Sequence, residues 1–340
     1  MLVSLYMIAY NEEKCLPDIL SDILAQTYPK ADTELVITDN CSTDNTYGML
    51  MDFREKHLSE YRDIKIIKND SRIIPSGLNR CLENASGDIL MRTDAHATIS
   101  PDFIEETVAC LEGKYTGERE FACGGVRPTY TAEGDGMGRM LLSAEESRFG
   151  ASAASYRGNP ERCYVDTVFQ AAYRREVIES VGKYDERLWR TEDNNYNYRV
   201  RQAGYRICFE PRIRSKQQIR SSLKKMLRQK NQNGYWVGYT LGVCPGCVST
   251  FHMVPLAFLL AVIATGISAV LGFGIFAAML WATYGLCNVA FTIKAILDTE
   301  DPSAHMLLLP IVFLLMHICY GAGTAAGIFK MIWHKLKKII

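Results

Sequence analysis

Two long charge-free runs constrain the fold of this chain more than any other feature. The first extends from Asn231 to Ile293 and the second from Ser303 to Phe329, and neither contains Asp, Glu, Lys or Arg. A helix needs about 20 apolar residues to span the hydrocarbon core of a membrane. The first run is therefore long enough for two spans and the second for one. The sequence predicts a transmembrane region over 251–340, with about three hydrophobic segments and a basic tail.

The alternative is a helical hairpin buried in a soluble core, which requires a polar stripe. Residues 254–281 (VPLAFLLAVIATGISAVLGFGIFAAMLW) are apolar on every helical face, which favours the membrane. Three full crossings place the basic tail on the side opposite to the amino-terminal part, against the positive-inside rule. A shallow hairpin at 271–275 (LGFGI) that does not cross fully is therefore also considered.

Most charged residues lie in the first 230 positions. The chain has 38 basic and 38 acidic residues, so its formal net charge is zero, which argues against nucleic acid as a partner. No basic leader precedes the first apolar run, and we expect the first 230 residues to stay in the cytosol. The eleven cysteines show no disulfide-like spacing, as expected of reduced thiols there.

Strand and helix patterns alternate through the first 110 residues. Short apolar runs at 2–9, 34–39, 64–67 and 88–92 are separated by segments of helical periodicity or by turns. Such alternation predicts an α/β fold with a largely parallel sheet covered by helices. Ligands of these sheets bind beyond the carboxyl ends of the strands.

Polar residues gather at these strand ends. Asn11 and Glu12 follow the first strand, Asp39 ends the second, and Asp94 and His96 follow the fourth. A parallel sheet brings all three groups to one rim. The chain has no glycine-rich phosphate loop, so a bound diphosphate needs another cation. An aspartate and a histidine there can hold Mg²⁺ or Mn²⁺, although a D-x-H triplet alone is more often a solvated turn.

A second acidic group opens a predicted helix. The spacing of apolar residues predicts that this helix begins at Glu192 and ends before Gly204. Asp193 then lies in the first turn, where the helix dipole favours an ionised carboxylate. Such a carboxylate can take a proton from an attacking hydroxyl. Alternatively, Glu192 and Asp193 only complement the helix dipole.

Four motifs occur in a characteristic order: IAYNEE, VITDNCSTDNT, GLNRCLENASGDILMRTDAH and TEDNNYNYRVRQAG. Together they resemble the family 2 glycosyltransferases of the GT-A fold, which move a sugar from a nucleotide diphosphate donor with inversion at the anomeric carbon. The resemblance covers about residues 1–210. It implies a cytosolic GT-A domain over 1–211, with a Rossmann-like mixed sheet and helices on both faces.

The resemblance also implies roles for single residues. Those that would contact the nucleotide sugar are Ala9, Tyr10, Asn11, Glu12, Asp39, Asn79 and Asp94. Asp39 would meet the uracil of a UDP-linked donor. Asp94 and His96 stand at the family's D-x-D motif, with His96 in place of the last Asp, and would hold Mn²⁺ or Mg²⁺. Glu192 and Asp193 match the family's Glu-Asp pair, in which the aspartate is the base.

Within the family, the segment VDTVFQAAYRREVIESVGKYDE and the ending HICYGAG are most similar to the membrane glucosyltransferases of succinoglycan-type exopolysaccharide assembly. This similarity implies a polyprenyl-linked acceptor, and residues 137–164 are expected to form the acceptor-side loop. Tyr235 replaces the arginine of the Q-x-x-R-W motif of processive members, which argues against a polymer synthase. Two alternatives stay open: a synthase that loads the first sugar onto polyprenyl phosphate, and a non-catalytic membrane scaffold.

Residues 212–250 join the two parts and are predicted to form juxtamembrane amphipathic helices. Eight basic and no acidic residues lie between Arg212 and Lys230, and apolar residues recur on one helical face. This pattern is typical of a basic amphipathic helix that lies at the interface of a membrane with anionic lipids. A solvated surface helix is the alternative. We expect a multi-pass protein of the cell membrane.

Overall fold

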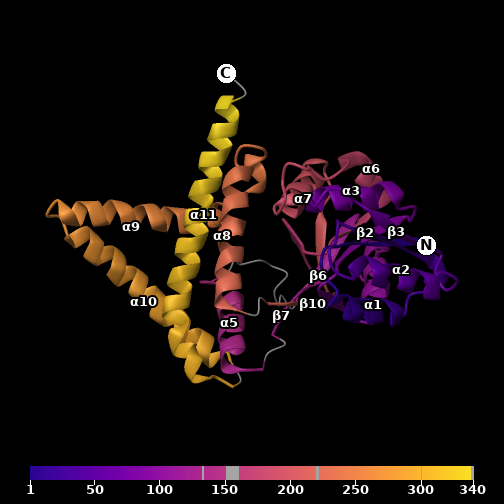
Figure 1. The fold of residues 1–340 in the computed structure, drawn as a ribbon, viewed down its shortest axis with the longest axis horizontal. Coiled ribbons are helices and arrows are strands. Elements are labelled where there is room, and N and C mark those ends of the chain that lie inside the picture. The colour runs from indigo at the N-terminus through magenta and orange to yellow at the C-terminus, as the bar shows by residue number, and fades with distance from the viewer. Residues whose placement is uncertain (132–133, 151–160, 220–221, 300, 338–340) are drawn as a thin grey trace. The chain divides into compact units, whose positions relative to one another are not determined.

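The computed structural model describes residues 1–131, 134–150, 161–219, 222–299 and 301–337 of the 340-residue chain. It forms two compact units, shown in Figure 1. The first comprises Met1–Pro128 and Ala154–Gln217, and the second comprises Thr129–Ala153 and Gln218–Ile340. Part of the predicted acceptor-side loop, residues 151–160, lies outside the described residues.

The first unit alternates strands and helices. Its strands are β1 (Val3–Ala9), β2 (Thr33–Asp39), β3 (Asp63–Lys68), β4 (Ile89–Asp94), β5 (Ala97–Ile99), β6 (Ala122–Val126), β8 (Cys163–Val165), β9 (Ala172–Arg174) and β10 (Ile207–Gln218). Its helices are α1 (Leu16–Leu24), α2 (Thr46–His57), α3 (Ile74–Asn84), α4 (Phe103–Leu111), α6 (Arg175–Val181) and α7 (Glu192–Gln202). The helix predicted to begin at Glu192 begins there.

The strands form one mixed sheet in the order β3-β2-β1-β4-β9-β6-β10-β5. The pairs β3/β2, β2/β1 and β1/β4 are parallel, whereas β9 runs antiparallel to β4. In this register Ile8 lies opposite Asp94, and Ala9 lies opposite Asp39. The carboxyl ends of β1, β2 and β4 therefore share one rim, as the sequence predicted.

Both faces of the central strands are buried under helices. Leu5 and Met7 of β1 belong to one apolar cluster, together with residues of α1, α2 and α4. Tyr6 points the other way and belongs to a second cluster, with residues of α3, α6 and α7. Burying one such side chain fully contributes roughly 1.5–3 kcal/mol. The sheet is thus covered on both sides, which confirms the predicted α/β architecture.

The second unit is mainly helical. Its elements are β7 (Thr129–Tyr130), α5 (Gly136–Glu146), α8 (Leu223–Thr240), α9 (Val254–Val270), α10 (Ile275–Leu297) and α11 (Leu309–Lys337). Three helical segments are long and apolar enough to cross a membrane: Thr250–Val270, Ile275–Leu297 and Ala304–Lys337. The predicted hairpin at 271–275 is a turn between α9 and α10, in which Gly272 has a φ of +95°.

Helices α8 and α11 lie side by side, as Figure 1 shows. Gly234 and Gly238 of α8 and Gly323 and Gly327 of α11 form two G-x-x-x-G pairs at the contact. A Cβ atom at any of the four would collide with a backbone carbonyl of the other helix. Small residues at this spacing let two helix backbones approach closely, which is a common way of packing helices in membranes.

The predicted amphipathic helix is wrong for residues 212–218. Residues up to Gln218 complete the long strand β10, and the helix begins only at Leu223. Ile213 and Ser215 are buried while their neighbours are exposed, so the segment alternates with the period of a strand. Further along, Lys230 does not face solvent or lipid: it is buried and forms a 2.8 Å ion pair with Glu145 of α5.

Candidate active site

Backbone strain marks the rim where β1, β2 and β4 end. Among the described residues, the non-glycine residues with positive φ are Asn11 at 55°, Cys41 at 60° and Gln170 at 49°. Asn11 follows β1 and Cys41 follows β2, while Gln170 lies just before β9, next to the end of β4. Strained backbone of this kind persists where the surrounding structure enforces it, and it is concentrated at functional sites.

Asp39 ends β2 with one carboxylate oxygen unsatisfied. Its side chain is buried, and Oδ2 accepts a 3.2 Å hydrogen bond from the backbone N–H of Ser42. Oδ1 is buried and has no hydrogen-bond partner among the residues that the structure describes. Ala9 lies opposite Asp39 in the sheet, and its carbonyl accepts from the backbone of Asn40. A buried unpaired acceptor at this edge fits a ligand with N–H donors, such as a nucleobase.

The segment after β1 wraps against the loop after β2. Oδ1 of Asn11 accepts a 2.7 Å hydrogen bond from the backbone N–H of Thr43. Tyr10 is exposed, with 42% of its surface accessible, and the guanidinium of Arg72 lies 5.6 Å from its ring centroid. Predicted residues 9–12 and Asp39 therefore lie together at one side of the rim.

Asp94 and His96 lie on the neighbouring part of the rim. Nδ1 of His96 is 3.0 Å from Oε1 of Glu12, and its Nε2 is 3.3 Å from Nε2 of Gln217. A carboxylate only accepts and an amide nitrogen only donates, so the tautomer with hydrogen on Nδ1 satisfies both contacts. In this tautomer the lone pair of His96 Nε2 accepts the hydrogen bond from Gln217, so a metal ion bound there would take the place of that hydrogen bond. Glu12, predicted as a nucleoside contact, orients this imidazole.

The donor atoms at this position fit a divalent ion. Burial opposes ionisation of Asp94, but the nearby positive charges, that of Arg92 above all, outweigh it and lower the pKa of that carboxyl group. An ionised carboxylate oxygen and an imidazole nitrogen suit Mn²⁺ or Mg²⁺. Within the described part of the chain, no cluster of three or more His, Cys, Asp or Glu side chains could hold a metal. The remaining ligands would come from a diphosphate and water.

Arg92 of β4 joins Asp94 to the start of α7. Its Nε lies 3.2 Å from Oδ1 of Asp94 and its Nη2 lies 3.6 Å from Oε1 of Glu192. Its Nη1 contacts Oδ1 of Asp193. The Arg92 side chain is 7% exposed, so one buried guanidinium faces three carboxylates. The structure thus brings Asp94, the predicted metal ligand, close to Glu192 and Asp193, the predicted catalytic acids.

The two acids at the start of α7 titrate abnormally. Burial, reinforced by the charge of Asp193, raises the pKa of Glu192 to about 8. Burial also raises the pKa of Asp193, against the opposing charges of Arg92 and Arg127. Glu192 is therefore mostly a neutral acid at neutral pH. Asp193 contacts Arg92 directly and can act as a base once it is ionised.

Sequence reasoning missed the cations of this site. Arg92 lies two residues before Asp94, on the same face of the strand, and that spacing is a signal that was available. Arg127 follows β6, is buried, and lies 3.7 Å from the ring centroid of Phe169. No sequence pattern near Arg127 points to the acids of the rim, because the sheet alone brings β6 and β4 together.

Asn79 of α3 has other contacts. Its Nδ2 donates to the carbonyl of Tyr184 at 3.1 Å and to Glu186 at 3.0 Å, and its Oδ1 accepts from the backbone of Tyr184 at 2.8 Å. The amide thus anchors the segment before α7 to α3. Its predicted contact with the donor stays a prediction.

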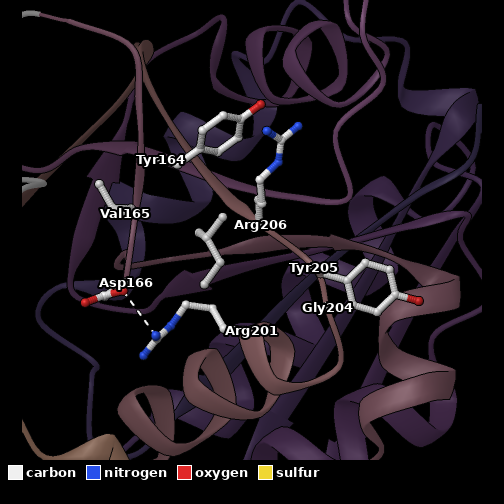
Figure 2. Close-up of a pocket in the computed structure, with 8 residues that line it drawn as sticks. Tyr164, Val165, Asp166, Arg201, Gly204, Tyr205 and Arg206 are labelled. Carbon is white, nitrogen blue, oxygen red and sulfur yellow. Dashed lines mark ion pairs between the residues drawn. The ribbon is translucent and has the colours of Figure 1, made fainter.

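A cavity of about 310 Å³ lies away from these residues, between the end of α7 and strands β8 and β10. Figure 2 shows Arg201 paired with Asp166 at 3.1 Å, and Arg206 beside the ring of Tyr164. None of the predicted site residues lines it. The rim, and not this cavity, is therefore the candidate active site.

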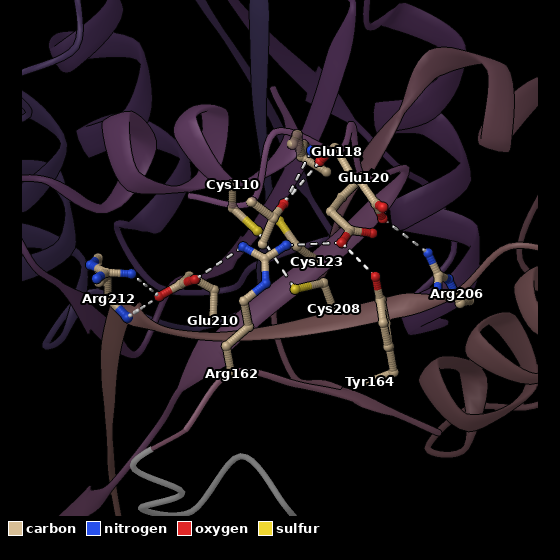
Figure 3. Close-up of polar contacts among 12 residues, drawn as sticks. Cys110, Glu118, Glu120, Cys123, Arg162, Tyr164, Arg206, Cys208, Glu210 and Arg212 are labelled. Carbon is tan, nitrogen blue, oxygen red and sulfur yellow. Dashed lines mark hydrogen bonds and ion pairs between the residues drawn. The ribbon is translucent and has the colours of Figure 1, made fainter. Parts of the chain in front are cut away.

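The buried cysteines of the first unit form no disulfide bonds. Sγ of Cys110 and Sγ of Cys208 are 3.8 Å apart, beside the Arg162 guanidinium that pairs with Glu120 and Glu210 (Figure 3). All eleven cysteines are unpaired as disulfides. Burial and the neighbouring thiols raise the pKa of Cys110 and Cys208, so neither is a nucleophilic thiolate.

A mixed α/β sheet with polar and acidic side chains beyond its strand ends is the architecture of a ligand-binding enzyme domain. The Glycosyl transferase family 2 profile matches residues 4–182, more than half of the chain, and the chain belongs to this family.

Two relatives in sequence bear on its reaction. The chain is 26% identical over 329 residues, 96% of its length and 97% of the relative's, to the dolichyl N-acetyl-alpha-D-glucosaminyl phosphate 3-beta-D-2,3-diacetamido-2,3-dideoxy-beta-D-glucuronosyltransferase of Methanococcus voltae. It is also 26% identical over 209 residues to the succinoglycan biosynthesis protein ExoA of Rhizobium meliloti, which covers 60% of this chain and 59% of that one. The similarity to the archaeal enzyme extends further along the chain.

Solved structures share the fold. The mannosyltransferase PcManGT of Pyrobaculum calidifontis, in complex with GDP-Man and Mn²⁺, superposes with a TM-score of 0.55 at 18% identity, covering 98% of this chain and 87% of that one. Staphylococcus aureus TarS in complex with UDP-GlcNAc gives a TM-score of 0.51 at 15% identity, covering 96% and 91%. These similarities confirm the GT-A-like fold.

Proposed function

We propose that this protein is an inverting, metal-dependent glycosyltransferase that moves a sugar from a UDP-linked donor to a polyprenyl-linked acceptor during assembly of an exopolysaccharide or another surface glycan. The observation that carries the proposal is the bridge made by Arg92, which holds the metal-side Asp94 and the base-side Asp193 at one rim. A single displacement requires the metal ion and the base to lie close together, on opposite sides of the transferred sugar.

The proposed reaction is a single displacement. The acceptor hydroxyl oxygen bonds to the anomeric carbon from the face opposite the diphosphate, and its proton passes to Asp193. The bond between the anomeric carbon and the diphosphate oxygen breaks, and its electron pair leaves on the nucleotide diphosphate. Burial raises the pKa of Asp193, which makes its carboxylate a stronger base. Glu192, as a neutral acid, limits the repulsion beside it.

Asp94 and His96 would hold the divalent ion, and such an ion offsets the negative charge that develops on the leaving diphosphate. Asp39, with its unpaired Oδ1, would receive the nucleobase beside Ala9. Tyr10 and Asn11 would complete that side of the pocket. Its fit to a nucleotide is supported by the solved GT-A structures that bind GDP-Man or UDP-GlcNAc.

The lipid-linked acceptor rests on two observations. The Methanococcus voltae relative, similar along nearly the whole chain, is named for a dolichyl phosphate-linked acceptor. The second unit also has three helices long and apolar enough to cross a membrane. We propose that these helices anchor a multi-pass protein in the cell membrane, with the sheet domain in the cytosol where nucleotide sugars are made.

Two alternatives predict different acceptors. A synthase that loads the first sugar would use polyprenyl phosphate, whereas the proposed enzyme would use a polyprenyl phosphate or diphosphate that already carries a sugar. A non-catalytic scaffold would use neither. To distinguish these alternatives, purified full-length protein in lipid nanodiscs is incubated with each acceptor and a radiolabelled donor. The donors are UDP-glucose, UDP-N-acetylglucosamine, UDP-galactose and GDP-mannose.

The proposal expects label in an extended lipid-linked glycan, and loss of that label when EDTA is added and its return with Mn²⁺. Label on polyprenyl phosphate alone would favour the loading synthase. An absence of transfer with every donor, despite nucleotide binding, would favour the scaffold.

A further inference from the structure

Gln170 has an unsatisfied polar atom at the rim. Its side chain is buried, with 4% of the residue exposed, and its Nε2 donates a long hydrogen bond of 3.4 Å to Oγ1 of Thr93. Oε1 is buried and bonds to nothing in the described residues. A buried acceptor without a partner costs free energy unless a ligand satisfies it.

The position of Gln170 is set by the pairing of β9 with β4. The two strands are antiparallel, and the backbone N–H of Arg92 donates to the carbonyl of Ala171 at 3.3 Å. Gln170 therefore lies beside Thr93, one residue before Asp94. The amide is thus next to the strand end where the sugar-diphosphate bond is proposed to break.

The backbone of Gln170 is held in an unfavourable conformation. Its φ of 49° lies in the left-handed region that non-glycine residues seldom adopt. On one side the ring of Phe169 packs against Arg127, and on the other Ala171 is hydrogen-bonded to β4. Glycine would relieve this strain, so the side chain at position 170 has a use that offsets its cost.

We infer that the free end of the Gln170 amide binds a hydroxyl group of the sugar at the reaction site and thereby selects the substrate. The inference rests on the proposed function. A hydroxyl both donates and accepts, so it satisfies the amide in either orientation of its oxygen and nitrogen. A sugar that lacks this hydroxyl is rejected, because the amide then stays unpaired.

The hydroxyl belongs to either the donor sugar or the acceptor sugar, and two assays on the full-length protein in nanodiscs separate them. The donor arm uses whichever of UDP-glucose, UDP-N-acetylglucosamine, UDP-galactose and GDP-mannose the wild type uses fastest. It compares the rate at which water hydrolyses this donor with the rates for its monodeoxy analogues. The acceptor arm compares transfer to a polyprenyl-linked sugar and to its monodeoxy analogues. Both arms are run with wild type and Gln170→Met, which has a similar shape without the amide.

The inference predicts that in one of the two arms the wild type has a kcat/KM about tenfold lower for one deoxy analogue than for the parent sugar. Gln170→Met should have the same kcat/KM for that analogue and for the parent sugar. Equal use of all analogues by the wild type, or unchanged discrimination in Gln170→Met, would show the inference wrong. If the wild type uses none of the four donors, the proposed function itself fails, which is a different result.

Two further variants separate recognition from folding. Gln170→Gly relieves the positive φ and removes the amide, so it folds at least as well as the wild type and still loses the discrimination. Gln26 is the matched control, because its buried amide is fully paired with the backbone of Asp22, Ser100 and Ile104. Gln26→Met lowers the melting temperature and leaves the discrimination intact. If Gln26→Met also lost the discrimination between sugars, the loss in Gln170→Met would be explained by general destabilisation.

Discussion

The guanidinium of Arg92 contacts the carboxylate of Asp193, although 101 positions separate them in the chain. The same side chain also contacts Asp94 and Glu192, so one buried cation holds together the end of β4 and the start of α7. Removing one partner of a buried charge network leaves the others uncompensated, which is far costlier than losing a surface pair. The site therefore depends on a residue that belongs to neither of the two acidic motifs.

Replacing Arg92 by Met should lower both stability and activity. Buried Asp94 and partly exposed Asp193 lose their cation, and the free energy of unfolding should fall by about 3–5 kcal/mol. Arg92→Lys keeps the charge but not the forked geometry, so it should be intermediate. Thermal unfolding and sugar transfer measure the two effects. The control is Arg80→Met at an exposed pair with Glu83, which should change stability by less than about 1 kcal/mol. A fully stable Arg92→Met protein would contradict the network.

The metal preference should depend on His96. Changing His96 to Asp restores two oxygen ligands, which favour Mg²⁺, and should raise the ratio of Mg²⁺-supported to Mn²⁺-supported activity. His96→Ala should weaken activation by either ion by about tenfold or more. Metal titrations of the transfer rate test both variants, with the surface variant His57→Ala as control. Activation curves for His96→Ala that superpose on those of the wild type would rule out His96 as a ligand.

Glu34 should make stability dependent on pH in acid. Burial opposes its ionisation, but hydrogen bonds from Ser4, Ser86 and Lys65 outweigh it and lower the pKa of Glu34 from 4.5 to about 2. Because the pKa is lower in the folded state, the stabilisation is complete above pH 4.5 and is lost as the pH falls towards 2. It amounts to at most about 3 kcal/mol.

The test compares the melting temperatures of the wild type and Glu34→Gln from pH 7 to pH 3. The wild type should be more stable at pH 7, and the difference should narrow below about pH 4.5. A difference that stays constant across this range would show that ionised Glu34 is not its source.

The G-x-x-x-G contact should be needed for packing α8 against α11. A leucine at position 327 would collide with the carbonyl of Tyr235, so Gly327→Leu should lower the melting temperature in detergent by several degrees. Gly285 of α10 has open space around its Cα, and Gly285→Leu serves as the matched control. Equal melting temperatures for the two variants would contradict the close approach of these helices.

The sequence predicted the strands, their shared rim and the acidic start of α7, because these depend on local periodicity and on the rule for parallel sheets. The positions of Asp39, Asp94 and Asp193 at strand and helix ends were predicted in this way, and their roles stay predictions. Arg92, Arg127 and Gln170 were missed. The spacing of Arg92 from Asp94 is visible in the sequence, but its contact with Asp193 is not. Arg127 and Gln170 have no local signature, and their importance comes from pairings that only the folded sheet creates.

The helix expected over 212–230 is present from Leu223 onward, but residues 212–218 belong to a strand, for a different reason. Basic residues were counted over the whole stretch, while the alternation of buried Ile213 and Ser215 with exposed Arg214 and Lys216 signals a strand. The ion pair between Lys230 and Glu145 could not be predicted from the sequence either, because Glu145 lies on a helix that is distant in sequence. Charge composition alone thus gave the wrong element for residues 212–218 and the wrong environment for Lys230.

The central claim is that Asp193 removes the proton of the acceptor hydroxyl. The most direct test compares Asp193→Asn with the wild type in single-turnover transfer and in nucleotide binding, with the exposed Asp166→Asn as control. The account predicts nucleotide affinity within about twofold of the wild type and a transfer rate lower by a factor of about 10²–10⁴. A transfer rate for Asp193→Asn equal to that of Asp166→Asn would contradict it.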